Sequence, residues 1–281
     1  MSDPNAPTDW AVYKAAVWRK HSQSLRFVKN TDTISLDDLV GIDTQTSQLL
    51  RNTHSFVNNH PANHALLWGA KGTGKSSLIK AIFNELSSKG LRLIEMDKDD
   101  LAFFPDVVDT IREQPFKFII FCDDLSFDPQ ETQYKHLKSV LEGSIEVPPD
   151  NVLIYASSNR RLLMPQFMQD NLESFSDQGE IHFSDTIEEK TSLADRFGLW
   201  LSFYAPDTQS YLRLVDHYLP HETDRHTLHI LANRFAIARG SKSGRTAKQF
   251  AIHYSQNQFL QSQQEHQQRT QKNHGKINTD V

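Results

Sequence analysis

Residues 69–77, GAKGTGKSS, place glycines, lysines and serines between two apolar stretches. The spacing Gly69-x-x-x-x-Gly74-Lys75-Ser76 matches the phosphate-binding pattern G-x-x-x-x-G-K-[ST]. Glycines let backbone N–H groups turn toward a polyphosphate, because no Cβ stands in the way. In this pattern the lysine bridges the β- and γ-phosphates, and the serine hydroxyl binds Mg²⁺. We therefore expect ATP and Mg²⁺ to bind at Gly69, Ala70, Lys71, Gly72, Thr73, Gly74, Lys75, Ser76 and Ser77.

Polar side chains also follow two later apolar runs. Asp123 and Asp124 come directly after the run at 116–122, and Asn159 follows the run at 151–157. Asp123 suits a Mg²⁺ ligand, and Asp124 is placed to orient or deprotonate the attacking water. Asn159 can hydrogen-bond the γ-phosphate and that water. The alternatives are a solvated aspartate pair in a turn and an ordinary turn asparagine.

Five apolar runs alternate with helical stretches, which is typical of a buried parallel sheet in an α/β domain. After the glycine loop, apolar residues in 78–86 recur at i, i+4 and i+8 and predict a helix. Ligands of open α/β sheets bind at the carboxyl ends of the strands, so Lys75, Asp123 and Asn159 fall on one edge. The expected strands are HALLWG (64–69), LRLIEM (91–96), FKFIIFC (116–122), NVLIYAS (151–157) and LWLSFYA (199–205).

The pattern changes along the chain and predicts four segments. Residues 1–35 are expected to form an N-terminal helical segment, and 36–205 an α/β nucleotide-binding domain. Three amphipathic stretches within 206–260 predict a helical lid domain. The stretch 261–281 is rich in glutamine and has no apolar period, so we expect a disordered tail.

Composition indicates a globular protein: 38% of residues are hydrophobic, 23% are charged, and the net charge is −5. This charge argues weakly against a general nucleic-acid coat. Apolar runs are far shorter than the ~20 residues of a membrane span, and no signal-peptide pattern appears. Cys122 is the single cysteine and lies in an apolar run, so we expect a core residue and a cytoplasmic location.

With these motifs, the chain from about residue 36 to 259 resembles the AAA+ ATPases. The resemblance implies a three-layer P-loop NTPase sheet of strand order 5-1-4-3-2 with a C-terminal helical lid. The segment DDLVGID (37–43) is similar to the family's adenine-binding segment, which implies contacts from Val40, Gly41 and Ile42. Many members carry Glu where this chain has Asp124, so the difference bears on hydrolysis rate more than on nucleotide binding.

Two arginines also match positions of that family. Arg196, in SLADRFGLWL, matches the arginine finger that reaches a neighbouring subunit's site, which implies a homo-oligomeric ring. Arg245, in GSKSGRTAKQF, matches the sensor 2 position and implies a γ-phosphate contact. The alternatives are a local ion pair of Arg196 with Asp195 and a solvated Arg245. The resemblance thus implies that Lys75, Asp123, Asp124, Asn159, Arg196 and Arg245 form the catalytic set.

A narrower resemblance is more specific. Segments that include NHPANHALLWGAKGTGKSSLIKA, LRLIEMDKDDL, FIIFCDDLSF, NVLIYASSNRRLL and SGRTAKQFA resemble the bacterial family of AAA+ ATPases called domain of unknown function 815. This family implies a fold and an ATP site but no cellular task.

Our first hypothesis is a Mg²⁺-dependent ATP hydrolase that drives conformational change in an unidentified macromolecular partner, protein or nucleic acid. The alternative is a slow nucleotide-gated loader or adaptor of the DNA-replication-initiator type, with little turnover. A small-molecule kinase shares the loop but ordinarily needs an acceptor pocket.

Other chemistry-bearing residues favour plainer interpretations. His221, His226 and His229 have metal-like intervals, but no Cys completes a site, so we expect a surface helix. His60 and His64 are interpreted in the same way. The acidic stretch 176–190, which contains Phe183, predicts a solvated insertion or, alternatively, an element facing a ring pore or a partner.

Overall fold

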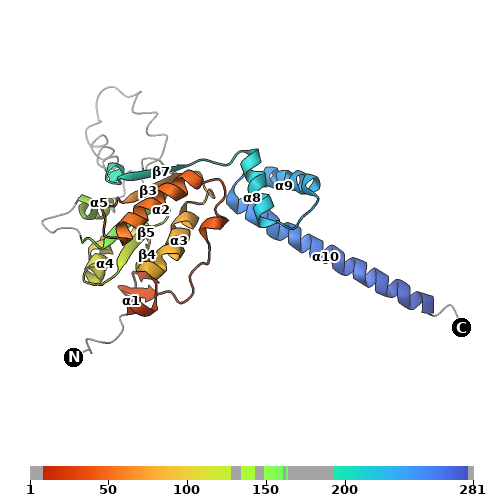
Figure 1. The fold of residues 1–281 in the computed structure, drawn as a ribbon, viewed down its shortest axis with the longest axis horizontal. Coiled ribbons are helices and arrows are strands. Elements are labelled where there is room, and N and C mark those ends of the chain that lie inside the picture. Colours follow the sequence, from red (N-terminus) through yellow and green to blue (C-terminus); the bar gives the residue numbers. More distant parts are fainter. Residues whose placement is uncertain (1–8, 128–133, 143–148, 161–162, 164–192, 278–281) are drawn as a thin grey trace, which may run out of the picture. The chain divides into compact units, whose positions relative to one another are not determined.

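The computed structural model describes residues 9–127, 134–142, 149–160, 163 and 193–277. The chain divides into two compact units, Met1–Tyr204 and Ala205–Val281, and each is described by itself (Figure 1). The predicted insertion at 176–190, with Phe183, lies outside the described residues.

Unit 1 is a sheet covered by helices (Figure 1). Its strands are β1 (Ala15–Arg19), β2 (Ser24–Phe27), β3 (Ala65–Gly69), β4 (Leu91–Met96), β5 (Lys117–Cys122), β6 (Val152–Ser158) and β7 (Leu199–Phe203). Its helices are α1 (Asp9–Val12), α2 (Asp43–Val57), α3 (Lys75–Leu86), α4 (Phe104–Ile111) and α5 (Tyr134–Glu142). Short 3₁₀ helices are η1 (Leu36–Asp38), η2 (Ser87–Lys89) and η3 (Lys98–Phe103).

The strand order is β2-β1-β4-β5-β6-β3-β7. The five predicted strands are β3 to β7, all parallel in their pairings, so the expected order 5-1-4-3-2 is confirmed. Alternate side chains of each strand enter opposite cores. Leu66 and Ile120 pack in one cluster with α4, whereas Leu67 and Ile119 pack in the other with α2 and α3. The predicted three-layer architecture follows from this alternation.

Cys122 lies at the end of β5, fully buried in the first of these clusters. Burial raises the pKa of its thiol to about 12, so the sulfur stays protonated at neutral pH. The structure confirms the prediction of a small core residue.

The prediction of a helical segment over residues 1–35 is wrong for the described residues 9–35. Of these, only the four residues of α1 are α-helical, and the chain continues into the hairpin β1–β2. β1 pairs in parallel with β4, with Ala15 opposite Leu93. Alanine favours helices, but pairing with an open sheet edge and burial of Ala16 and Trp18 outweigh this local preference.

A buried arginine ties the N-terminal segment to this sheet. Arg92 donates from Nε to the Trp10 carbonyl oxygen at 2.7 Å and from Nη1 to the Ser87 carbonyl oxygen at 3.1 Å. Its guanidinium also lies 4.0 Å from the centroid of the Phe116 ring. The Trp10 ring in turn packs edge-on against Phe118, with centroids 5.0 Å apart. The segment before the hairpin is therefore part of the core of unit 1.

His64 has a structural role instead of a metal-binding one. Its Nδ1 accepts a hydrogen bond from the backbone N–H of Ile154 at 3.0 Å, which requires an unprotonated nitrogen. Burial lowers the pKa of this imidazole to about 4. His64 directly precedes β3, and its neutral side chain therefore links the start of β3 to β6.

This pKa predicts pH-dependent stability. Between about pH 6.5 and pH 4 the unfolded chain binds a proton at His64 that the folded chain does not bind, so stability falls as pH falls. We expect His64→Asn, which keeps a side-chain acceptor without titrating, to remove about 2 kcal/mol of the stability loss between pH 7 and pH 5. Urea unfolding of both proteins at the two pH values measures the difference. His60→Asn, at an exposed loop position, is the control, and an unchanged pH slope in His64→Asn would contradict the assignment.

Unit 2 consists of α8 (Thr208–Tyr218), α9 (Arg225–Arg239) and α10 (Gly244–Ile277). The buried Tyr211 hydroxyl donates to the Ala232 carbonyl oxygen at 3.1 Å and joins α8 to α9. His229 Nε2 lies at hydrogen-bond distance, 2.8 Å, from Asp216 Oδ1, so this histidine joins α9 to α8. No helix of the described residues has the length and apolarity that a membrane span requires.

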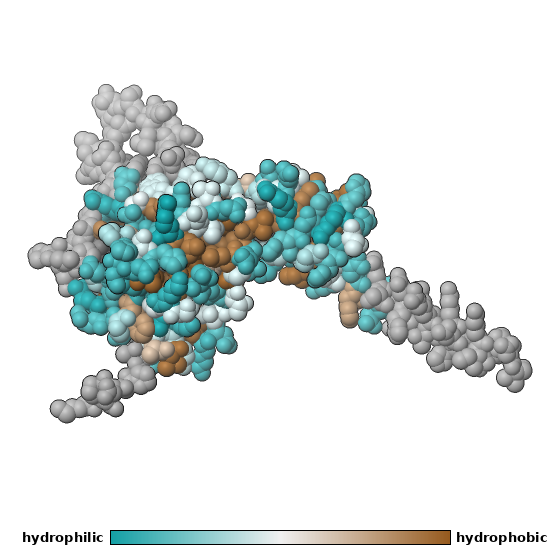
Figure 2. Space-filling model, viewed as in Figure 1, coloured by the Kyte–Doolittle hydropathy of each residue, from teal (hydrophilic) through white to brown (hydrophobic). Residues whose placement is uncertain are grey.

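The glutamine-rich stretch differs from expectation. α10 continues through residues 261–277, where the composition predicts disorder, so that prediction is wrong for these residues. Glutamine, lysine and arginine are good helix formers, and extending a helix that is already packed needs no new nucleation. On unit 2, apolar surface is scattered among hydrophilic surface (Figure 2).

Candidate functional site

The predicted phosphate loop joins β3 to α3, and its backbone requires glycine. Gly69, Gly72 and Gly74 have φ values of +134°, +73° and +100°. A Cβ on Gly69 would lie 1.9 Å from the Phe203 carbonyl oxygen. Among the described residues no side chain caps α3, so the first-turn N–H groups and the positive end of the helix dipole are available to an anion.

Lys75 is the first residue of α3 and is only 7% exposed. Its Nζ donates to the carbonyl oxygens of Gly69 and Ala70 at 2.8 and 2.7 Å, and to Asn159 Oδ1 at 3.2 Å. Burial lowers the pKa of the ammonium group, while the nearby carboxylates of Asp123 and Asp124 raise it. The structure thus brings the predicted lysine and asparagine together.

The predicted metal ligands also converge. Ser76 Oγ donates to Asp123 Oδ1 at 2.8 Å, from the start of α3 to the end of β5. Hydroxyl and carboxylate oxygens are the ligands that Mg²⁺ prefers, and it is commonly held by one or two protein oxygens together with phosphates. The two side chains therefore fit Mg²⁺. In the part of the chain that is described, no cluster of three or more His, Cys, Asp or Glu side chains could hold a metal on its own.

Asp124 has a left-handed backbone, with φ of +52°. Aspartate tolerates this region better than glutamate, which gives a physical reason for the shorter acid here. The Asn159 amide donates from Nδ2 to Asp124 Oδ1. Asn159 thus contacts Lys75 with its oxygen and Asp124 with its nitrogen, and a single side chain bridges two predicted catalytic groups.

Sequence reasoning missed Ser157. This β6 residue is 2% exposed, and its Oγ donates to Asp123 Oδ1 and accepts from the Asp124 backbone N–H at 3.1 Å. The available signal was its position two residues before Asn159, because side chains at i and i+2 share one face of a strand.

The predicted adenine segment leads into α2. Gly41 has φ of +81°, and Ile42 follows immediately before the helix. A Cβ on Gly74 would lie 3.3 Å from Ile42 Cδ1, so this side chain lies against the phosphate loop. Val40 is partly buried. The structure therefore places one of the three predicted adenine contacts at the loop, and the adenine contacts themselves stay predictions.

The predicted roles of the two arginines, Arg196 as an arginine finger and Arg245 as a γ-phosphate contact, stay predictions. Arg196 is exposed and lies three residues before β7, the position expected from the sequence. Arg245 is exposed in the first turn of α10, whose start Ser243 caps by accepting the Thr246 N–H at 3.1 Å. Arg245 belongs to unit 2, whereas the phosphate loop belongs to unit 1.

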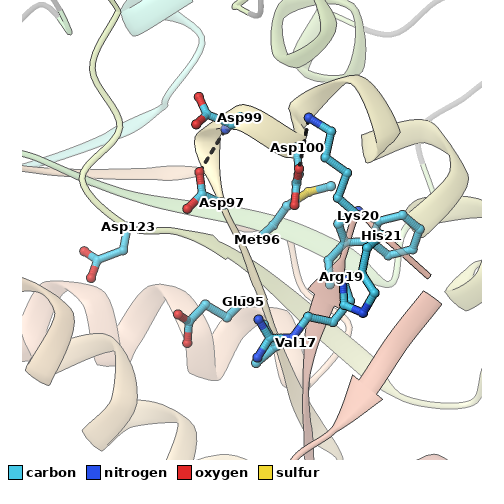
Figure 3. Close-up of a pocket in the computed structure, with 11 residues that line it drawn as sticks. Val17, Arg19, Lys20, His21, Glu95, Met96, Asp97, Asp99, Asp100 and Asp123 are labelled. Atoms are coloured by element: carbon cyan, nitrogen blue, oxygen red, sulfur yellow. Dashed lines mark hydrogen bonds and ion pairs between the residues drawn. The ribbon is translucent and has the colours of Figure 1, made fainter. Parts of the chain in front are cut away.

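A pocket of about 500 Å³ lies beside Asp123, at the carboxyl ends of β1 and β4 (Figure 3). Lys20 Nζ lies 3.9 Å from Asp100 Oδ1, and burial raises the pKa of this carboxyl group. The sequence did not predict this pocket, because residues 1–35 were assigned to a helix. Its lining is Val17, Trp18, Arg19, Lys20, His21, Glu95, Met96, Asp97, Asp99, Asp100 and Asp123.

Comparisons with known proteins agree with this fold. One similar solved structure is that of Thermotoga maritima RuvB, described as the Holliday junction branch migration motor. The alignment covers 78% of this chain and 63% of the RuvB chain, with 14% sequence identity and a TM-score of 0.50. Another is the FIGL-1 AAA domain in complex with ADP. The alignment covers 79% of this chain and 73% of the FIGL-1 chain, with 18% sequence identity and a TM-score of 0.52. At such identities these likenesses show the fold alone.

Sequence comparison gives a curated relative and a family. The probable replication factor C subunit 5 of Dictyostelium discoideum is 29% identical over 104 residues, which span 36% of this chain and 28% of that relative. The family described as "Protein of unknown function (DUF815)" matches residues 11–258. The chain therefore belongs to the DUF815 family, and its fold is that of the AAA+ ATPases.

Proposed function

We propose that this protein is a Mg²⁺-dependent ATP hydrolase that uses the reaction to change the conformation of a macromolecular partner. The observation that carries the proposal is the connected set of side chains at the carboxyl ends of the strands. Ser76 contacts Asp123, and Asn159 contacts both Lys75 and Asp124. Such a set suits phosphoryl transfer, where catalysis consists of positioning and charge stabilisation.

Each side chain has a role in this proposal. The uncapped start of α3 and the side chain of Lys75 bind the phosphates. Ser76 and Asp123 would hold Mg²⁺, which would neutralise negative charge on the phosphates. Asp124 orients or deprotonates water for attack on the γ-phosphate, and Asn159 positions that water. The ADP-bound AAA domain of similar fold supports nucleotide binding.

We further propose that the protein acts in the cytoplasm as a homo-oligomer. In this assembly Arg196 of one protomer acts at its neighbour's site, and Arg245 contacts the γ-phosphate. The exposure of both side chains supports these assignments, since such roles require accessible guanidinium groups. Arginine forms bidentate contacts with phosphate, which an exposed lysine does not reproduce.

The lysine of the phosphate loop tests the proposal. We expect Lys75→Ala to weaken ATP binding at least tenfold and to abolish hydrolysis, because the buried ammonium is the loop's phosphate contact. Lys89→Ala removes an exposed lysine outside the loop, at the end of η2, and is the control. Calorimetric titration with ATP and Mg²⁺, and phosphate release, measure the two effects. Equal binding by wild type and Lys75→Ala would overturn the assignment of this loop.

A second candidate is a nucleotide-gated loader or adaptor with little turnover. Its support is the double contact of Asn159, which engages Lys75 and Asp124 together and so occupies both groups before a nucleotide arrives. The partial similarity to a probable replication factor C subunit is consistent with it. Weak hydrolysis together with ATP-dependent, salt-sensitive DNA binding would favour this candidate.

A further inference from the structure

We propose that Ser157 is a positioning residue of the ATP site, which fixes the metal-binding carboxylate of Asp123 and the backbone of Asp124 through one buried hydroxyl. This inference rests on the proposed function, because it assigns Ser157 to the same site. Ser157 is 2% exposed, so solvent does not supply alternative partners for its hydroxyl.

The hydrogen bonds around Ser157 replace the strand ladder where it ends. Cys122 opposite Ala156 is the last residue pair between β5 and β6. Beyond it, the Ser157 carbonyl oxygen accepts from the Leu125 N–H at 2.7 Å, and Ser157 Oγ accepts from the Asp124 N–H at 3.1 Å. A single serine therefore holds the turn that follows β5.

The proton of the same hydroxyl has a fixed destination. Because Oγ accepts from the Asp124 N–H, its own proton is donated to Asp123 Oδ1. Asp123 Oδ1 also accepts from Ser76 Oγ at 2.8 Å and from the Asp124 N–H at 3.1 Å. Three donors on one oxygen fix the orientation of the Asp123 carboxylate. The carboxylate is therefore already ordered before a metal binds.

The consequence for Asp124 concerns its backbone. At φ of +52° an L-residue is held in a sparsely populated conformation, and it persists there because its surroundings fix it. The hydrogen bond from the Asp124 N–H to Ser157 Oγ is part of that fixation. Loss of the hydroxyl should therefore loosen the acid that orients the attacking water, as well as the metal ligand.

The neighbouring serine provides a matched control. Ser158 is fully buried on the same strand, and its Oγ accepts from the Arg160 backbone N–H at 3.1 Å. Adjacent residues of a strand point to opposite faces, so the two hydroxyls differ in partners but not in depth. A merely structural role of a buried serine would be shared by both positions.

The experiment compares Ser157→Ala, Ser157→Cys and Ser158→Ala with wild type. The cysteine variant replaces the hydroxyl with a somewhat larger thiol that is only a weak donor, so it reports on the hydrogen bond even if the alanine variant does not fold. We measure ATP affinity as a function of Mg²⁺ concentration by fluorescence titration, and kcat and KM by phosphate release. The first readout needs no turnover and is therefore independent of hydrolysis.

We expect both Ser157 variants that fold to need 10–100-fold more Mg²⁺ for half-maximal ATP binding, the range found when residues that orient metal ligands are removed. At saturating Mg²⁺ the variants should have lower kcat with unchanged KM for ATP, and Ser158→Ala should match wild type. Unchanged Mg²⁺ dependence in the Ser157 variants, or an equal change in Ser158→Ala, would overturn the proposal. A wild type without hydrolysis but with the Ser157-dependent Mg²⁺ shift would defeat only the hydrolase function, whereas a wild type without Mg²⁺-linked ATP binding would defeat both.

Discussion

Asp124→Asn is expected to lower the ATP hydrolysis rate by about 10²–10⁴-fold while leaving ATP and Mg²⁺ binding intact, because a general base of this kind contributes that factor. Asparagine cannot accept the proton of the attacking water. It does tolerate the left-handed backbone that Asp124 adopts, at φ of +52°. Its side-chain oxygen can also accept from the Asn159 amide, as the carboxylate does. The fold of the turn should therefore survive.

Phosphate release at saturating ATP, together with calorimetric ATP binding, separates the two effects. Asp99→Asn, which removes an exposed carboxylate after β4, is the matched control and should retain the wild-type rate. A variant Asp124→Asn that hydrolyses ATP as fast as wild type would show that another group activates the water. If the wild-type protein itself hydrolysed ATP as slowly as Asp124→Asn, the second candidate, a nucleotide-gated loader or adaptor, would gain support.

Arg196→Ala is expected to lower the ATPase rate per protomer by about 10³–10⁵-fold, the range for arginine fingers in related phosphoryl transfer. The reason is loss of the cation that stabilises charge on the γ-phosphoryl group. If that cation comes from a neighbouring protomer, wild-type specific activity should rise with protein concentration as the oligomer forms. ATP binding should be unchanged, because the finger acts on the transition state.

The measurement is specific activity over a range of protein concentrations, for wild type, Arg196→Ala and Arg51→Ala. Arg51 is an exposed arginine of α2 and serves as the matched control. Mixing the Arg196→Ala protein with the Asp124→Asn protein should restore part of the activity. In mixed oligomers, some sites combine an intact arginine from one protomer with an intact Asp124 from its neighbour. A rate that is flat with concentration and indifferent to Arg196 would exclude the shared site.

Much of the fold could be predicted because its signals are local. Strands β3 to β6 lie inside the sheet and are mostly buried, and all five predicted strands appear in the sequence as apolar runs. The N-terminal strand β1, which lies between β2 and β4, lacks that signal, since its short AAVWR pattern also suits a helix. Its conformation depends on pairing with β4, which lies more than seventy residues away in the chain. Local propensity does not contain that pairing.

The candidate site shows the same division. The loop at 69–77 and the strand-terminal Asp123, Asp124 and Asn159 could be named from residue type and spacing, because their chemistry requires those types at those positions. Ser157 had only one signal, its position two residues before Asn159, and the pocket beside Asp123 had none, since a basic hairpin has no sequence signature of a site.

By itself, the sequence determined the phosphate loop, the acidic strand end and the parallel α/β architecture. Only the tertiary structure decided that Asn159 bridges Lys75 and Asp124, that Ser157 holds Asp123, and that the N-terminal hairpin extends the sheet. The physical reason is that motifs and apolar periods are properties of neighbouring residues. Hydrogen bonds between strand ends form between residues that are distant in the chain, and their partners exist only after the sheet has assembled.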